Sequence, residues 1–154
     1  MLNTFMNKYK FLFRVAALGL ALQTPAFADE VLDKARDLVN QKAGKAALDL
    51  LVPLEGTRAG DVEYDYLLGL AALDAGDPQL AIFALERVLA VNPQHAQARA
   101  EIARALFEVG ERDSAKREFQ AVLDTNPPPQ VRQTIDRFMS ALSVGQRRLS
   151  GFFE

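Results

Sequence analysis

Two stretches of the chain repeat one order of apolar, small and polar positions, 34 residues apart. Residues 67–93 read LLGLAALDAGDPQLAIFALERVLAVNP, and residues 101–127 read EIARALFEVGERDSAKREFQAVLDTNP. In each stretch, two helix-like segments rich in apolar residues flank one glycine, Gly76 or Gly110. This pattern predicts two helices joined by a turn in each unit.

Small residues occupy aligned positions on the expected helices. Gly69 and Ala103 stand on the first helix of each unit, and Ala81 and Ala115 stand on the second. Two antiparallel helices pack closely only where neither projects a large side chain, so that the ridges of one enter the grooves of the other. We therefore expect Gly69 to face Ala81, and Ala103 to face Ala115.

Turn residues predict where these helices begin and end. Gly76 and the aligned glycine of the next unit suit the left-handed conformation at a helix C-terminus. Asp77 can cap the following helix, with Pro78 at its first position. Each second helix is expected to stop before a proline, Pro93 or Pro127.

A 34-residue period with a helix–turn–helix in each unit resembles the tetratricopeptide repeat family. The resemblance implies an all-α solenoid over residues 29–145, ended by a C-terminal capping helix. Its units would span about residues 28–61, 62–95 and 96–129, and the capping helix about residues 129–144.

The two ends of the expected array are less regular. In the degenerate first unit, Ala35 and Ala47 form the small pair, and Pro53 interrupts the second helix. The capping helix has one apolar face, which a terminal helix buries against the array, and Gly145 is expected to end it. That face consists of Val131, Ile135, Phe138, Met139 and Leu142.

Residues 1–28 have the three parts of a secretory signal peptide. Lys8 and Lys10 precede an apolar run, FLFRVAALGLAL, and Ala26-Phe27-Ala28 forms an A-x-A cleavage site. The run is shorter than the roughly 20 residues that span a bilayer, so we expect cleavage after Ala28 and no transmembrane segment afterwards. These residues hold three of the 18 basic residues and none of the 20 acidic ones, which leaves the rest with a net charge of −5.

Little in the sequence favours catalysis. There is no cysteine, no glycine-rich phosphate loop, no G-x-S-x-G motif and no H-E-x-x-H motif. The one histidine, His95, falls in a turn between units, where we expect it to be solvated. Asp61, Glu63 and Asp65 begin a helix, where carboxylates interact favourably with the helix dipole. We expect no enzyme activity, no cofactor, no metal and, at this net charge, no nucleic-acid partner.

The family resemblance implies a concave groove lined by the first helices. Its groove positions correspond here to Glu63, Tyr66, Leu70, Leu73, Gln97, Ala100, Arg104 and Phe107. Such a surface, apolar and aromatic with one arginine, suits a protein or peptide segment with apolar anchors and an acid. An alternative stays open, namely that Tyr66, Leu73 and Phe107 pack against neighbouring helices.

The order of parts gives a closer resemblance. A signal peptide, repeats, the segment NPPPQVRQTIDRF at residues 126–138 and then GFFE resemble the N-terminal domain of surface lipoprotein assembly modifier-like proteins. In that family, periplasmic repeats precede an outer-membrane β-barrel, for which residues 146–154 would be a start. The resemblance implies a scaffold in the periplasm of a Gram-negative bacterium that docks a protein or peptide, such as a lipoprotein or outer-membrane protein. The alternative is a structural plug or brace for such a barrel.

Overall fold

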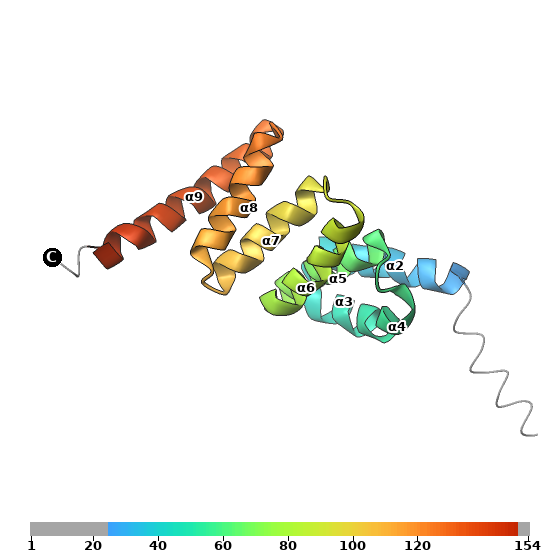
Figure 1. Ribbon diagram of the computed structural model, residues 1–154. Helices are drawn as coiled ribbons and strands as arrows, with labels where there is room; N and C mark the ends of the chain where they lie inside the picture. The colour runs from blue at the N-terminus through green and yellow to red at the C-terminus, as the bar shows by residue number, and fades with distance from the viewer. Residues whose placement is uncertain (1–24, 151–154) are drawn as a thin grey trace, which may run out of the picture.

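The computed structural model describes the backbone of residues 25–150 and the side chains of residues 30–143. Within that range the regular structure is entirely helical, as the sequence predicted (Figure 1). Most of the predicted signal peptide and residues 151–154 lie outside the described residues. The helices are α2 (Pro25–Asn40), α3 (Gly44–Leu51), η2 (Val52–Leu54), α4 (Glu55–Arg58), α5 (Val62–Ala75), α6 (Pro78–Val91), α7 (Ala96–Glu108), α8 (Arg112–Asp124) and α9 (Pro129–Ser150).

The long helices form an array in which each packs on its neighbours in sequence (Figure 1). In addition, α2 packs against α5, and α5 against α7. The first helices of successive units therefore lie side by side. This arrangement creates a surface that runs across several units.

The predicted turn chemistry is confirmed. Gly76 has φ of 82° and Gly110 has φ of 86°, both in the left-handed region. The carboxylate of Asp77 accepts a hydrogen bond of 3.0 Å from the backbone N–H of Leu80, and Pro78 is the first residue of α6. Both second helices, α6 and α8, end before their Asn-Pro pair.

The small positions allow close packing, but Gly69 also meets a large side chain of α6. Ala81 is fully buried, yet the nearest neighbour of Gly69 is Leu85, one turn further along α6. A Cβ at position 69 would lie 2.5 Å from Leu85 Cγ. At Gly44 the approach is equally close but to backbone, because a Cβ there would lie 2.5 Å from the backbone nitrogen of Ala75. The N-terminus of α3 thus touches the backbone of α5.

Three clusters of buried residues follow one another along the array. The first lies among α2, α3 and α5 and includes Leu51 and Leu68. The second lies among α5, α6 and α7 and includes Leu85 and Ile102. The third lies among α7, α8 and α9 and includes Phe119. The helices α5 and α7 thus each contribute to two clusters, and Ala84 of α6 also belongs to the first.

The C-terminal helix packs its apolar face on the third cluster, where Ile135 and Leu142 are buried. Phe138 stacks on Phe119 at 5.1 Å between ring centroids. The prediction that Gly145 ends this helix is wrong, since α9 continues to Ser150. One glycine costs a helix only about 1 kcal/mol, and the next residues, Gln-Arg-Arg-Leu, favour helix.

Candidate interaction surface

Ion pairs connect the first helices across one surface. Arg36 of α2 pairs with Glu63 of α5. Lys42, in the turn after α2, has its Nζ 3.4 Å from Asp74 Oδ1 of α5. Arg104 of α7 has one Nη 3.9 Å from the same oxygen. We call this surface the first-helix face and define it by Arg36, Lys42, Glu63, Tyr66, Leu70, Asp74, Gln97, Glu101, Arg104 and Glu108.

Several predicted groove residues lie on this face. Glu63 and Gln97 are exposed, whereas Tyr66, Leu70 and Arg104 are half-buried. Glu63, Tyr66 and Leu70 follow one another along α5 at spacings of three and four residues, so they share one side of the helix. The structure therefore brings these five predicted residues onto one surface made by α5 and α7.

Leu73 and Phe107 are placed differently, and for both of them the packing alternative holds. It also holds in part for Tyr66, which packs against the second buried cluster. Leu73 is only 6% exposed and belongs to the second buried cluster. Phe107 is half-buried and meets the ring of Phe138 edge-on, with 5.5 Å between centroids. Leu73 has almost no surface to offer a ligand, and Phe107 joins α7 to α9.

Arg104 is not the free cation that the sequence suggested. Its Nε lies 3.2 Å from Glu101 Oε2 and 3.8 Å from Glu108 Oε1, and Asp74 lies beyond its other end. We call Lys42, Asp74, Glu101, Arg104 and Glu108 the charge cluster. With two cations and three carboxylates its formal charge is −1, so this part of the face is acidic rather than basic.

Burial raises the pKa values of two groups on this face, Glu101 and Tyr66. Loss of solvent raises the pKa of Glu101, and the nearby guanidinium of Arg104 only partly opposes this. Loss of solvent also raises the pKa of Tyr66 to about 12, with the charge of Glu101 adding to the effect. At neutral pH Tyr66 is therefore an uncharged phenol beside an incompletely compensated carboxylate.

Sequence reasoning missed the carboxylates of this cluster. Asp74 follows Leu70 by four residues, while Glu101 and Glu108 flank Arg104 at spacings of three and four. Such spacings put side chains on one helical face. The sequence therefore shows which of these residues share a face of one helix. It does not show that the two helices meet at Asp74.

His95 is not simply solvated, contrary to expectation. It is half-buried and caps α7, where its Nδ1 accepts a hydrogen bond of 3.1 Å from the backbone N–H of Ala98. Its ring lies 5.0 Å from that of Tyr66. The imidazole ring thus has a structural role beside the first-helix face.

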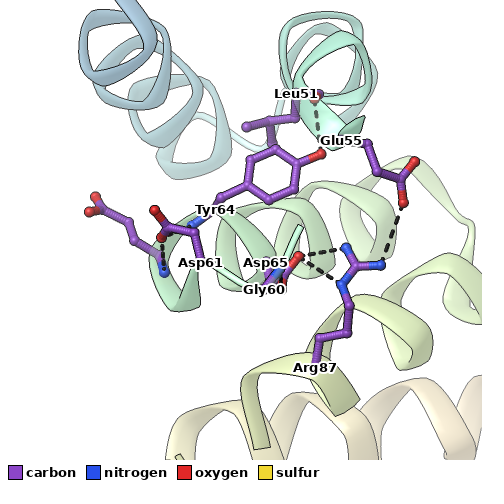
Figure 2. A network of polar contacts seen from close by, with 8 residues as sticks. Leu51, Glu55, Gly60, Asp61, Tyr64, Asp65 and Arg87 are labelled. Atoms are coloured by element: carbon purple, nitrogen blue, oxygen red, sulfur yellow. Dashed lines mark hydrogen bonds and ion pairs between the residues drawn. The ribbon is translucent and has the colours of Figure 1, made fainter. Parts of the chain in front are cut away.

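A second polar network lies between α4, α5 and α6 (Figure 2). Asp65 is 1% exposed and accepts hydrogen bonds from Arg87 Nε at 2.9 Å and from the Gly60 N–H at 2.8 Å. Arg87 also lies 3.5 Å from Glu55. Asp65, which lies in the first turn of α5, therefore has further partners besides the helix dipole. All its partners are internal, so the network stabilises the fold.

Nearby, the Tyr64 hydroxyl donates a hydrogen bond of 3.1 Å to the carbonyl of Leu51. This bond connects α5 to the end of α3, where Pro53 interrupts the helix as predicted. Together with the Asp65 network, it holds the segment 52–60, in which η2 and α4 bury no residue of their own.

Neither a three-residue metal site nor a membrane-spanning helix is found in the part of the chain that the structure describes. Its acidic and histidine side chains form no group of three that could hold a metal ion. None of the helices between residues 25 and 150 combines the length and apolar character needed to cross a bilayer.

The repeated helix pairs have the tetratricopeptide repeat fold, and residues 72–136 match the family model described as tetratricopeptide repeat. Two solved structures share the fold. The Sgt2 tetratricopeptide repeat domain from Aspergillus fumigatus gives a TM-score of 0.68 at 16% identity, covering 80% of this chain and 83% of that one. The Yersinia enterocolitica type III secretion translocator chaperone SycD gives a TM-score of 0.67 at 14% identity. That match covers 86% of this chain and 93% of SycD.

In sequence, the chain resembles the surface lipoprotein assembly modifier of Moraxella catarrhalis. The two are 33% identical over 132 residues, which cover 83% of this chain. The match spans 25% of that relative's length. The resemblance is therefore to one part of a longer protein.

Proposed function

We propose that this protein is a non-enzymatic scaffold that docks a protein or peptide on its first-helix face. The observation that carries the proposal is the convergence of Glu63, Tyr66, Leu70, Gln97 and Arg104 on one accessible surface that crosses two units. Tyrosine and arginine are enriched among residues that dominate binding energy. Stacked helical repeats commonly bind extended partners in this way.

We also propose that the partner is a lipoprotein or outer-membrane protein, met in the periplasm of a Gram-negative bacterium. The name of the Moraxella catarrhalis relative supports the partner class. The signal-like residues 1–28 support export. Since the match covers a quarter of that relative, the proposal for this chain is docking alone.

Site-specific photo-crosslinking tests the surface with a matched pair of positions. Gln97 and Gln79 are both exposed glutamines, and each is the second residue of its helix. Gln97 lies on the first-helix face, whereas Gln79 lies on the second helix α6. A photo-reactive residue at each position, in cells that also make a surface lipoprotein, would report contacts by mass spectrometry.

We expect crosslinks to the lipoprotein from position 97 and few or none from position 79. A third probe at Arg137, on the polar side of α9, examines the alternative structural role. If position 137 crosslinks to an outer-membrane protein and position 97 to nothing, bracing through α9 replaces docking.

A further inference from the structure

We propose that the charge cluster is a subsite for a basic side chain, lysine or arginine, on the docked segment. This inference rests on the proposed function and specifies its partner. It reverses the chemistry suggested by sequence, which was an acidic residue binding to Arg104.

The first support is the environment of Asp74. Its side chain is only 10% exposed, yet its contacts with Lys42 Nζ are 3.4 and 3.5 Å and that with Arg104 is 3.9 Å. Charge-assisted hydrogen bonds between ammonium or guanidinium and carboxylate groups are usually about 2.7–2.9 Å. Lys42 is 72% exposed. A buried carboxylate therefore retains hydrogen-bonding capacity.

The second support is the pairing of Glu101 with Arg104. Glu101 Oε2 and Arg104 Nε are both buried atoms at 3.2 Å, but neither makes a hydrogen bond. Burial raises the pKa of Glu101, which shows that the surrounding cations do not fully offset its loss of solvent. A partner's cation would supply both charge and N–H donors to Glu101.

The third support is the charge and ring chemistry around the cluster. Among the residues that define the first-helix face, Glu63 pairs with Arg36, and the excess negative charge belongs to the cluster. Asp33, outside that set, also pairs with Arg36. Tyr66 contributes an uncharged ring, and cations bind favourably to the faces of such rings. His95, which packs on Tyr66, uses its Nδ1 as a helix cap. The cluster and its aromatic neighbour together suit a cation on an apolar stem.

A purely structural role for the cluster makes a different prediction. If Glu101 mainly joined α7 to its surroundings, Glu101→Gln would destabilise the protein. The raised pKa indicates the opposite, because the folded state binds the proton of Glu101 more tightly than the unfolded state does. Stability from this group is present at low pH and is lost as pH rises from about 4.5 to the folded-state pKa. We therefore expect Glu101→Gln to melt at or above the wild-type temperature at pH 7.

The test uses three synthetic peptides of 12 residues with identical leucine and phenylalanine positions. Two central positions carry lysine, glutamine or glutamate. Binding to the purified protein is measured by fluorescence anisotropy at low and high salt. We expect the lysine peptide to bind at least tenfold more tightly than the glutamate peptide, and high salt to reduce the difference.

Two variants with the same chemical change locate the subsite. Glu101→Gln should weaken the lysine peptide about fivefold or more and leave the glutamine peptide unchanged. Glu86→Gln, at an exposed position of α6, should change neither. The inference is overturned if the lysine peptide has no advantage, if both variants act alike, or if Glu101→Gln melts well below wild type.

The two proposals fail separately. If position 97 crosslinks to the lipoprotein but the lysine peptide binds no more tightly than the others, the docking proposal stands and the basic subsite does not. Absence of crosslinks from position 97 would remove docking itself, and with it the inference that depends on it.

Discussion

Gly44 and Gly69 both allow two helices to pack closely, but Gly44 lies against backbone atoms and Gly69 against a side chain. At position 69 the neighbour is the Leu85 side chain, which can change its rotamer. At position 44 the neighbours are the backbone nitrogen of Ala75 at 2.5 Å and the carbonyl oxygen of Ala71 at 2.6 Å. Backbone within a helix cannot move aside alone, so a methyl group at position 44 must push α3 away from α5.

We therefore predict that Gly44→Ala destabilises the protein more than Gly69→Ala. Overpacking typically costs about 1–3 kcal/mol, and we expect position 44 at or above the top of that range. Gly56→Ala is the control, because nothing lies within 4 Å of a Cβ there. Urea unfolding of the three variants measures the differences. A larger loss for Gly69→Ala than for Gly44→Ala would contradict this account.

Tyr64 gives a prediction at alkaline pH. It is fully buried, and burial raises its pKa to about 12 from an ordinary value of 10. The folded state therefore holds the phenolic proton more tightly than the unfolded state. Stability from this group is complete below pH 10 and is lost as pH rises to about 12.

Replacing Tyr64 with Phe should make the loss of stability between pH 10 and 12 less steep. The variant will be less stable at pH 7, because the carbonyl of Leu51 loses its hydrogen bond. Thermal melts across this pH range compare the two slopes, to which other groups contribute equally. Parallel curves for the two proteins would argue against a raised pKa at Tyr64.

Residues whose role depends on neighbours in sequence were the ones that could be predicted. The left-handed Gly76 and the capping Asp77 act within one turn of chain, so the local pattern was sufficient. Asp74 and Glu101 depend on two helices meeting. No local pattern gives that distance, so the sequence suggested a free Arg104 where the structure has an acidic cluster.

At the scale of elements, Arg87 and Asp65 join α5 to α6 through a buried ion pair, with a shortest contact of 2.5 Å. The hydrogen bonds that Arg87 donates to Asp65 raise the pKa of Arg87, so the guanidinium stays charged. We predict that Arg87→Met costs about 3–5 kcal/mol, because removing one partner leaves a buried charge uncompensated.

The double variant Asp65→Asn with Arg87→Met should recover part of that loss, since no unpaired charge remains. Arg117→Met, at an exposed position of α8, is the control for the substitution itself. Denaturant unfolding gives the four free energies of a double-mutant cycle. An additive result would show that the pair contributes little as a pair.

Helix positions followed well from the sequence because the 34-residue period repeats the same turn signals. The break near Pro53 was predicted for the same reason. The end of α9 was not predicted correctly, because a single glycine does not end a helix when the residues after it favour helix. After Gly145 there is no proline or second turn residue until Gly151.

At the scale of the whole molecule, the predicted cleavage site lies inside a helix. Pro25 begins α2, and cleavage after Ala28 would shorten that helix by four residues. Its first described buried residue is Leu32, beyond the site. We predict that the exported protein begins at Asp29 and melts like the full chain. N-terminal sequencing and calorimetry check this, and a Met1 terminus on exported protein would contradict it.

The three buried clusters contain ten, eight and six residues in order along the described chain. A repeat array opens from its ends, and an end that buries less opens at lower free energy. Backbone amides of α8 and α9 should therefore exchange with deuterium before those of α3 and α5. The helix α5, which carries part of the proposed docking face, would then lie on the slow-exchanging side of a molecule that loosens progressively toward its C-terminus.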